Sequence, residues 1–194
     1  MFKNIFSLKS HSADSKQPDS SAGSESADLA AELLIAPTAL MQLSLHEARE
    51  VVRYMHPQLV PKGTIFIQEG DAGDTGFMML LLDGEATVEI MVASRVEPII
   101  LNVLGRGSLI GELGLLDGQP RFASCVAATP LRCAVLTRKS LQRLIQENAP
   151  LAAKLLLAIS ISIGVRLRDT TGKLKMYIQL THVMEQEVGS RTSA

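Results

Sequence analysis

The spacing of apolar residues changes along the chain and divides it into segments. From residue 7 to residue 28 the sequence is mostly Ser, Asp, Ala and Lys, with hardly an apolar side chain. Such a segment buries too little apolar surface to offset the entropy cost of ordering it. We therefore predict a disordered N-terminal tail over residues 1–30.

A helix and a series of strands are expected next. Ser44 and Glu47 have the spacing of a capping box, and the apolar residues that follow share one helical face until Pro57. Short β-rich runs separated by Gly, Asp and Pro then predict strands at 64–68, 76–82, 86–92, 99–104, 122–129 and 131–137. Asp83-Gly84 has the chemistry of a type I′ turn, which predicts a hairpin between the second and third runs.

Helical spacing returns after the last strand. Leu141, Leu144 and Ile145 predict a brief helix, and from residue 151 to about 188 apolar residues recur at three- and four-residue steps. The chain is therefore predicted to be mainly β with flanking helices. Its domain should cover residues 31–147, followed by a long helix over 148–188 and a disordered tail over 189–194.

The long helix carries an apolar seam with coiled-coil spacing, formed by Leu156, Ile159, Ile163, Leu167, Thr170, Leu174, Tyr177, Thr181, Met184 and Val188. We expect a homodimer through this seam. The alternative is that its first half packs on the sheet and the rest is a solvated extension, in which Gly172 costs about 1 kcal/mol relative to Ala.

Composition and charge limit the expected cellular compartment and the expected binding partners of the protein. A net charge of −1 over 194 residues does not favour sequence-independent binding to nucleic acid. Cys125 and Cys133 lie in apolar stretches, which predicts buried reduced thiols and a cytoplasmic protein. The first ten residues lack the apolar run of a signal peptide. The longest apolar stretch, Leu155–Val165, is shorter than the roughly 20 residues that cross a bilayer, so no membrane span is expected.

The loop over residues 105–121 carries the candidate chemistry. Its glycines let the backbone approach a ligand, and Glu112–Leu116 can form one helical turn whose N–H groups face an anion. Arg121 can hold a phosphate with a bidentate fork, while Glu112 can accept a hydrogen bond from a sugar hydroxyl. A ribose phosphate would satisfy both. The alternative is a Gly-rich corner with a surface ion pair between the two side chains.

The run Gly111-Glu112-Leu113-Gly114, with Arg121 nine positions after the Glu, resembles the cyclic-nucleotide-binding domains of catabolite activator proteins and of cyclic-AMP-dependent kinase regulatory subunits. The resemblance covers about residues 43–184 and includes Pro61, Gly63, Gly70, Asp71, Gly84 and Pro120. It implies an antiparallel β-roll (jelly-roll) domain with a long C-terminal helix.

The resemblance also implies roles for single residues. Glu112 would bind the ribose 2′-hydroxyl and Arg121 the cyclic phosphate of cyclic AMP or cyclic GMP. Main-chain N–H groups complete the phosphate cradle at Gly111, Leu113, Gly114 and Ala123. No other cofactor and no metal is implied.

Two features depart from the family pattern, the residue after Arg121 and the place of a threonine pair. Phe122 stands where the family has Ala, Ser or Thr, and its ring either folds outward or fills the cradle. Thr170 and Thr171 resemble the Thr-Ser pair with which catabolite activator proteins contact adenine from both subunits, but they come about one helical turn later. The alternative for this pair is that the two threonines are simply exposed.

These observations predict a stand-alone cyclic-nucleotide-binding signalling module, with cyclic AMP as the leading ligand and an unknown protein effector. The alternative is an interaction or scaffold module that keeps the fold without a ligand. An enzyme is not expected, because His11, His46, His56 and His182 are scattered and have no catalytic or metal-binding partners at a suitable spacing. Few residues follow Met184, so no DNA-binding domain and no direct DNA binding are expected.

Overall fold

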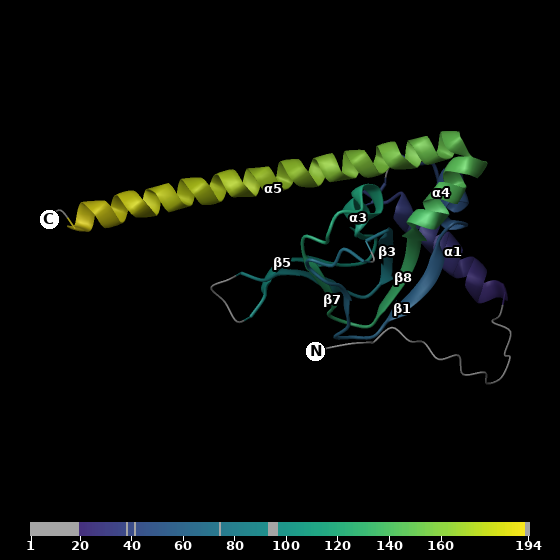
Figure 1. Ribbon diagram of the computed structural model, residues 1–194, viewed down its shortest axis with the longest axis horizontal. Coiled ribbons are helices and arrows are strands. Elements are labelled where there is room, and N and C mark those ends of the chain that lie inside the picture. The colour runs from purple at the N-terminus through teal and green to yellow at the C-terminus, as the bar shows by residue number, and fades with distance from the viewer. Residues whose placement is uncertain (1–19, 38, 41, 74, 93–96, 193–194) are drawn as a thin grey trace.

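The computed structural model describes residues 20–37, 39–40, 42–73, 75–92 and 97–192 (Figure 1). In chain order its elements are α1 (Ser20–Leu34), α2 (Leu45–Val52), β1 (His56–Val60), β2 (Ile65–Ile67), β3 (Phe77–Asp83), β4 (Ala86–Ile90), β5 (Ile99–Leu104), β6 (Leu109–Ile110), α3 (Glu112–Asp117), β7 (Ser124–Ala127), β8 (Leu131–Thr137), α4 (Arg138–Glu147) and α5 (Ala149–Thr192).

The strands form two antiparallel sheets, with the orders β1-β8-β3-β6 and β2-β7-β4-β5. This arrangement confirms the predicted antiparallel β-roll with flanking helices and a long C-terminal helix. Two strands were not predicted. β1 contains Pro57 and exposes four of its five residues, so buried and exposed residues do not alternate along this strand. β6 has only two residues, Leu109 and Ile110, and both are buried.

The predicted hairpin at Asp83-Gly84 is wrong. β3 and β4 flank this turn but belong to different sheets, since β3 pairs with β8 and β6 whereas β4 pairs with β7 and β5. Gly84 does have a positive φ of 91°, and a Cβ there would collide with the carbonyl oxygen of Pro130. Glycine is therefore needed for a close crossing between the sheets. The local turn chemistry does not determine which strands pair.

The helix α1 lies where the sequence pattern predicted a tail. It begins at Ser20, and its C-terminal end buries Ala30, Ala31 and Leu34. The prediction of disorder is therefore wrong for residues 20–30, because packing at the end of the helix compensates for its polar first turns. Residues 1–19 lie outside the described residues. At the other end α5 continues to Thr192, so the predicted tail from residue 189 is helical at least that far.

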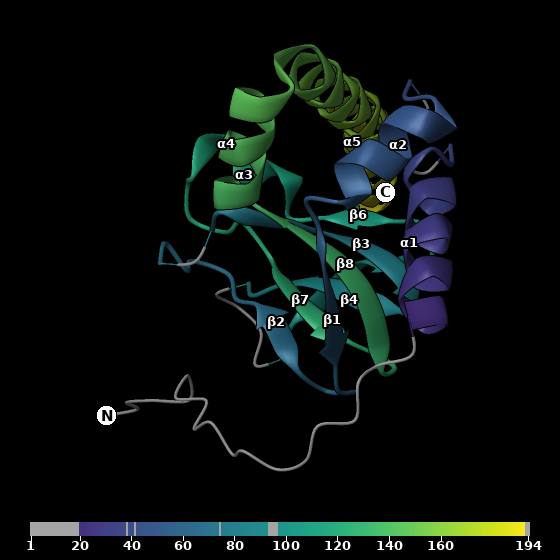
Figure 2. The ribbon, with the colours of Figure 1, turned by 90° about the vertical axis from the view of Figure 1, so that its right-hand side faces the viewer.

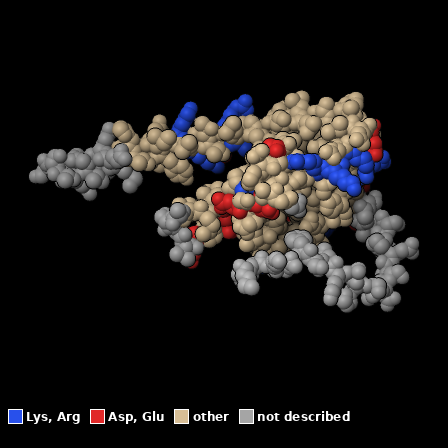
Figure 3. All heavy atoms as spheres, viewed as in Figure 1, with Lys and Arg blue, Asp and Glu red and all other residues tan. Residues whose placement is uncertain are grey.

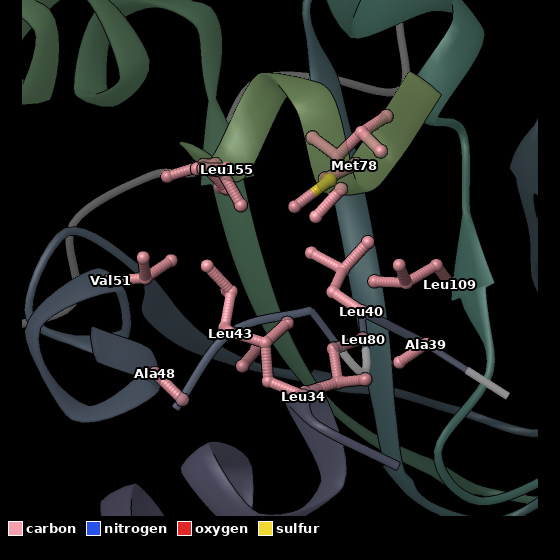
Figure 4. Close-up of a cluster of buried hydrophobic side chains, with 14 of the residues drawn as sticks. Leu34, Ala39, Leu40, Leu43, Ala48, Val51, Met78, Leu80, Leu109 and Leu155 are labelled. Carbon is pink, nitrogen blue, oxygen red and sulfur yellow. The ribbon is translucent and has the colours of Figure 1, made fainter. Parts of the chain in front are cut away.

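Two hydrophobic clusters hold the fold together. One lies between the helices and the sheet that contains β3, and there the side chains of Leu34, Leu43 and Leu80 lie next to one another (Figure 4). The other fills the space between the two sheets and includes Leu81 and Cys125. Figure 2 shows the helices gathered toward one side of the strands, so no helix of the described residues covers the other side of the roll.

The capping box predicted at the start of α2 is confirmed. The backbone N–H of Ser44 donates to Glu47 Oε2 at 2.8 Å, and the backbone N–H of Glu47 donates back to the serine hydroxyl at 3.3 Å. Lys154 of α5 donates to the same carboxylate at 2.7 Å. These hydrogen bonds, first that of Lys154 and then those of Ser44, lower the pKa of Glu47 to about 2. The carboxylate therefore remains charged at neutral pH and links α2 to α5.

The helix α5 has two different parts. Leu155, Ala158 and Ile159 are fully buried in the helical cluster, whereas the helix runs well past the roll beyond them (Figure 1). By length and composition alone, the helix segment Ala149–His182 could cross a membrane, because it contains an 18-residue window with a mean hydropathy of 1.7. A bilayer span would have to withdraw those buried residues from the core. The absence of a membrane span stays a prediction.

Candidate functional site

The loop after β6 forms the short helix that its sequence predicted. Gly111 has a φ of 83° and directly precedes α3. This left-handed conformation turns the chain sharply from β6 into the helix, and it is accessible to glycine at little cost. A Cβ at Gly111 would lie 3.0 Å from the guanidinium of Arg121 and 3.1 Å from the carbonyl oxygen of Phe77. Glycine thus serves both the turn and the packing of the arginine.

Arg121 is held in position by both its backbone and its side chain. Its N–H donates to the carbonyl of Asp71 at 2.9 Å, and its carbonyl accepts from the N–H of Gly70 at 2.7 Å. Its side chain is buried and donates to the carbonyls of Gly111 at 2.9 Å and Phe77 at 3.2 Å. The guanidinium carbon also lies 4.6 Å from the centre of the Phe77 ring. The arginine is therefore ordered by the protein itself.

Gly114 makes room for that guanidinium. A Cβ at this position would overlap Arg121 and would lie 2.6 Å from the carbonyl oxygen of Thr75. The last residue of the Gly111–Gly114 run therefore determines how closely α3 can approach the arginine.

Glu112 forms an ion pair with a residue that the sequence reasoning did not place at the site. Its carboxylate is buried and accepts a hydrogen bond from Arg166 Nη1 of α5 at 2.6 Å. Arg166 Nη2 donates to the carbonyl of Leu109 at 2.8 Å. No local pattern marks this arginine, because only the fold brings α5 over the loop. Since Glu112 and Arg121 are both buried, the alternative of a surface ion pair between them is wrong.

A cavity of about 260 Å³ opens beside these groups. It is lined by Ile67, Val88, Leu104, Leu109, Ile110, Gly111, Glu112, Leu113, Gly114, Asp117, Gln119, Pro120, Arg121, Phe122, Ala123, Cys125 and Arg166. The predicted site residues of the loop all contribute to this lining. The cavity lining combines two guanidinium groups and two carboxylates with an apolar wall, which the sheet that contains β2, β4, β5 and β7 supplies.

Thr170 and Thr171 are not brought to the cavity of their own chain. Both are exposed, and their hydroxyls donate within α5 to the carbonyls of Arg166 and Leu167, each at 2.8 Å. Arg166, one turn earlier, occupies the position over the loop. The expectation that the threonine pair contacts a ligand is therefore not met within one chain, because the register of α5 places the arginine there.

Phe122 does not fill the cradle. It contributes to the lining of the cavity, yet 67% of the residue is exposed. Of the two alternatives for its ring, the outward one is correct. The next residue, Ala123, is buried against the cavity. The bulky ring therefore leaves the space beside Arg121 open.

A second arginine, Arg138 at the start of α4, clamps the other end of α3. Its Nη2 donates to the carbonyl of Gly114 at 2.7 Å and its Nε to that of Leu115 at 3.3 Å. The last carbonyls of a helix lack partners within the helix, so a cation there satisfies hydrogen bonds and favours the helix dipole. This residue was also missed by the sequence reasoning, and it ties α3 to the terminal helices.

Other groups add no further chemistry at this site. Cys125 and Cys133 are buried free thiols, as predicted, and burial raises the pKa of Cys125 to about 12 and that of Cys133 to about 11. Within the described ranges no three His, Cys, Asp or Glu side chains gather as metal ligands. Figure 3 shows acidic and basic side chains in separate groups, and the largest basic group on that face lies toward the end of the molecule that carries α4.

The family comparison agrees with this geometry. Residues 57–148 match the family model for the cyclic nucleotide-binding domain. This part of the chain belongs to the cyclic nucleotide-binding domain family. The matched residues contain both sheets except His56 at the start of β1, together with α3 and the loop with Glu112 and Arg121. Arg166 lies outside the match, on the part of α5 that folds back over the nucleotide-binding domain.

Kinase regulatory subunits and cyclic nucleotide-gated channels are among the proteins similar to part of this chain. A cAMP-dependent protein kinase regulatory subunit from Pyricularia oryzae is 35% identical over 112 residues, which are 58% of this chain and 27% of the relative. A cyclic nucleotide-gated potassium channel from Rhizobium etli is 30% identical over 121 residues, which are 62% of this chain and 32% of the relative. The chain thus spans about a third or less of these relatives.

Solved structures share the fold over most of the chain. A cyclic nucleotide-binding domain from Methylobacillus flagellatus superposes with a TM-score of 0.66 at 28% identity, covering 77% of this chain and 82% of the other. The catabolite activator protein of Thermus thermophilus gives a TM-score of 0.60 at 28% identity, covering 74% and 62%.

Proposed function

We propose that this chain is a cyclic-nucleotide sensor with cyclic AMP as its leading ligand and no catalytic activity of its own. One observation carries the proposal: Arg121 and Glu112, both buried, line one cavity together with the start of α3. The two side chains place a cation and a hydrogen-bond acceptor at the same open space, and a phosphate with a neighbouring hydroxyl group needs both. A phosphate ester of ribose suits this pair of groups.

Each part of the ligand has a counterpart in the cavity. Arg121 supplies a guanidinium fork for the anionic phosphate, and the main-chain N–H groups of α3 and Ala123 surround the same space. Glu112 uses Oε1 for Arg166, which leaves Oε2 to accept a hydrogen bond from the ribose 2′-hydroxyl. The apolar wall then receives the base.

The proposal is tested by calorimetry of the full chain with cyclic AMP, cyclic GMP and non-cyclic 5′-AMP. We expect saturable binding of one cyclic nucleotide per chain and much weaker binding of 5′-AMP, whose phosphate is not held against the ribose. A folded protein that binds neither cyclic nucleotide would instead support the scaffold alternative, in which the fold remains and the ligand is lost.

Two ion-pair and hydrogen-bond links support transmission of ligand occupancy to the terminal helices. Arg166 connects Glu112 to α5, and Arg138 connects the end of α3 to α4. A ligand that moves α3 would alter both links. A ligand that hydrogen-bonds to the carboxylate of Glu112 would alter the link to Arg166. We propose that a cytoplasmic protein effector recognises the resulting position of α5. The net charge of −1 favours a protein partner over DNA.

The exposed stripe of α5 is the proposed dimer contact. Past the roll, Leu167, Leu174 and Tyr177 are each more than half exposed and lie on one face of the helix. Unlike these residues, Ile163 packs against the helical core cluster, so it belongs partly to the fold of the monomer. A second copy of α5 would cover the stripe, in the manner of a helix pair.

Replacing Leu167 and Leu174 together with Asp should shift the protein from dimer to monomer in sedimentation experiments. Carboxylates facing each other across an apolar seam would be desolvated and would repel. Met176→Asp is the matched control, because Met176 is equally exposed but lies on the other side of the helix. A dimer that survives the double substitution would place the interface elsewhere.

A further inference from the structure

Phe122 differs from the other exposed apolar residues of this protein. Single exposed apolar side chains are common on protein surfaces and need no explanation by themselves. Among the described residues, however, Phe122 is the only large exposed hydrophobic residue that also lines the cavity beside Arg121. It is also the only aromatic ring in that lining. Its exposed face therefore borders the space that a ligand would enter.

The position of Phe122 indicates which part of a bound ligand it would contact. It directly follows Arg121 and precedes the buried Ala123, so its backbone is fixed next to the phosphate end of the cavity. Since the backbone is fixed while the ring remains exposed, the ring forms part of the rim. The same cavity has an apolar wall that includes Val88 and Leu104. A flat apolar group attached to the bound sugar would extend from the polar end along this wall and past the ring.

We propose that Phe122 stacks on the base of the nucleotide, so that the site selects purines by the area of the ring system. This inference rests on the proposed function and specifies its ligand class. A phenyl ring has no hydrogen-bonding group, so it cannot read the edge that distinguishes adenine from guanine. Its contact with a base depends on overlap of the two flat faces, and a purine offers two fused rings where a pyrimidine offers one.

The proposal predicts how the effect of Phe122→Ala depends on the ligand. Affinity for cyclic AMP and for cyclic GMP should fall by the same factor, roughly tenfold. Affinity for cyclic CMP should fall less, and that for base-free ribose 3′,5′-cyclic phosphate should not change. Phe122→Trp should keep purine affinity, whereas Phe122→Leu, which keeps the apolar character but loses the flat face, should resemble Phe122→Ala.

Calorimetry of these variants with the four ligands is the test, and Leu116→Ala is the matched control. Leu116 is an exposed apolar residue of α3 outside the cavity lining, so its removal should leave all four affinities unchanged. Stacking is overturned if Phe122→Ala binds cyclic AMP as tightly as the wild type, or if it loses cyclic AMP and the base-free ligand equally. A wild type that binds none of the four ligands would instead overturn the proposed function itself, and the stacking role with it.

Discussion

Replacing Arg121 with Ala is expected to reduce affinity for cyclic AMP by about 2 to 5 kcal/mol, the usual cost of removing one partner from a buried charge pair. The guanidinium is buried and already oriented by the carbonyls of Gly111 and Phe77. A phosphate that enters the cavity therefore meets a cation whose ordering cost has been met during folding. Without it, the phosphate would be desolvated with only main-chain N–H groups to compensate. Calorimetry measures the loss directly.

Two further variants separate binding from folding. Arg121→Lys keeps the charge but lacks the fork that reaches two carbonyls, so its affinity should lie between those of the wild type and Arg121→Ala. Arg106→Ala removes an exposed arginine of the same loop and should change little. Urea unfolding of each variant shows whether the domain is intact. An intact Arg121→Ala protein with unchanged affinity would remove this residue from the phosphate site.

The loop could be predicted from the sequence because its information is local. Residues 111–114 and Arg121 lie within eleven positions, and the structure brings them to one cavity. Gly111 turns the chain, α3 forms at once, and Gly114 leaves space for the guanidinium. The strands were found for a similar reason, since β-rich runs between turn residues mark them one at a time.

The missed features all depend on contacts between distant segments. Arg166 reaches Glu112 across 54 residues, and Arg138 reaches Gly114 across 24. Asp83-Gly84 has the residues of a hairpin turn, yet it passes the chain between two sheets. The polar first turns of α1 gave no sign of a helix, because its stability comes from Ala30, Ala31 and Leu34 packing at its far end. Such packing is decided by tertiary structure and leaves little trace in local composition.

The ion pair between Arg166 and Glu112 yields the second prediction. Arg166→Met keeps an apolar stem of similar length but leaves the buried carboxylate of Glu112 without that cation. Removing one partner of a fully buried pair costs about 3 to 5 kcal/mol. The Arg166 side chain is 42% exposed and that of Glu112 8%. Solvent screening therefore reduces the expected loss to about 1 to 3 kcal/mol in the free energy of unfolding.

A double-mutant cycle distinguishes the pair from general packing. Glu112→Gln removes the charge, so adding Arg166→Met to it should cost less than adding it to the wild type. Arg168→Met, which removes an exposed arginine half a turn further along α5, is the control and should leave stability unchanged. Additive effects of the two substitutions would mean that the ion pair contributes nothing to stability.

The same substitution tests whether the pair transmits ligand occupancy. In the wild type, cyclic AMP should change the amide hydrogen exchange of both α3 and the part of α5 around Arg166, because Glu112 belongs to the cavity and to the link. In Arg166→Met the change at α3 should persist while that at α5 is lost. The cavity would then still bind its ligand, but the helix would no longer respond. If α5 responds equally in both proteins, occupancy reaches it by another route, and Arg138 at the junction of α3 and α4 is the next link to remove.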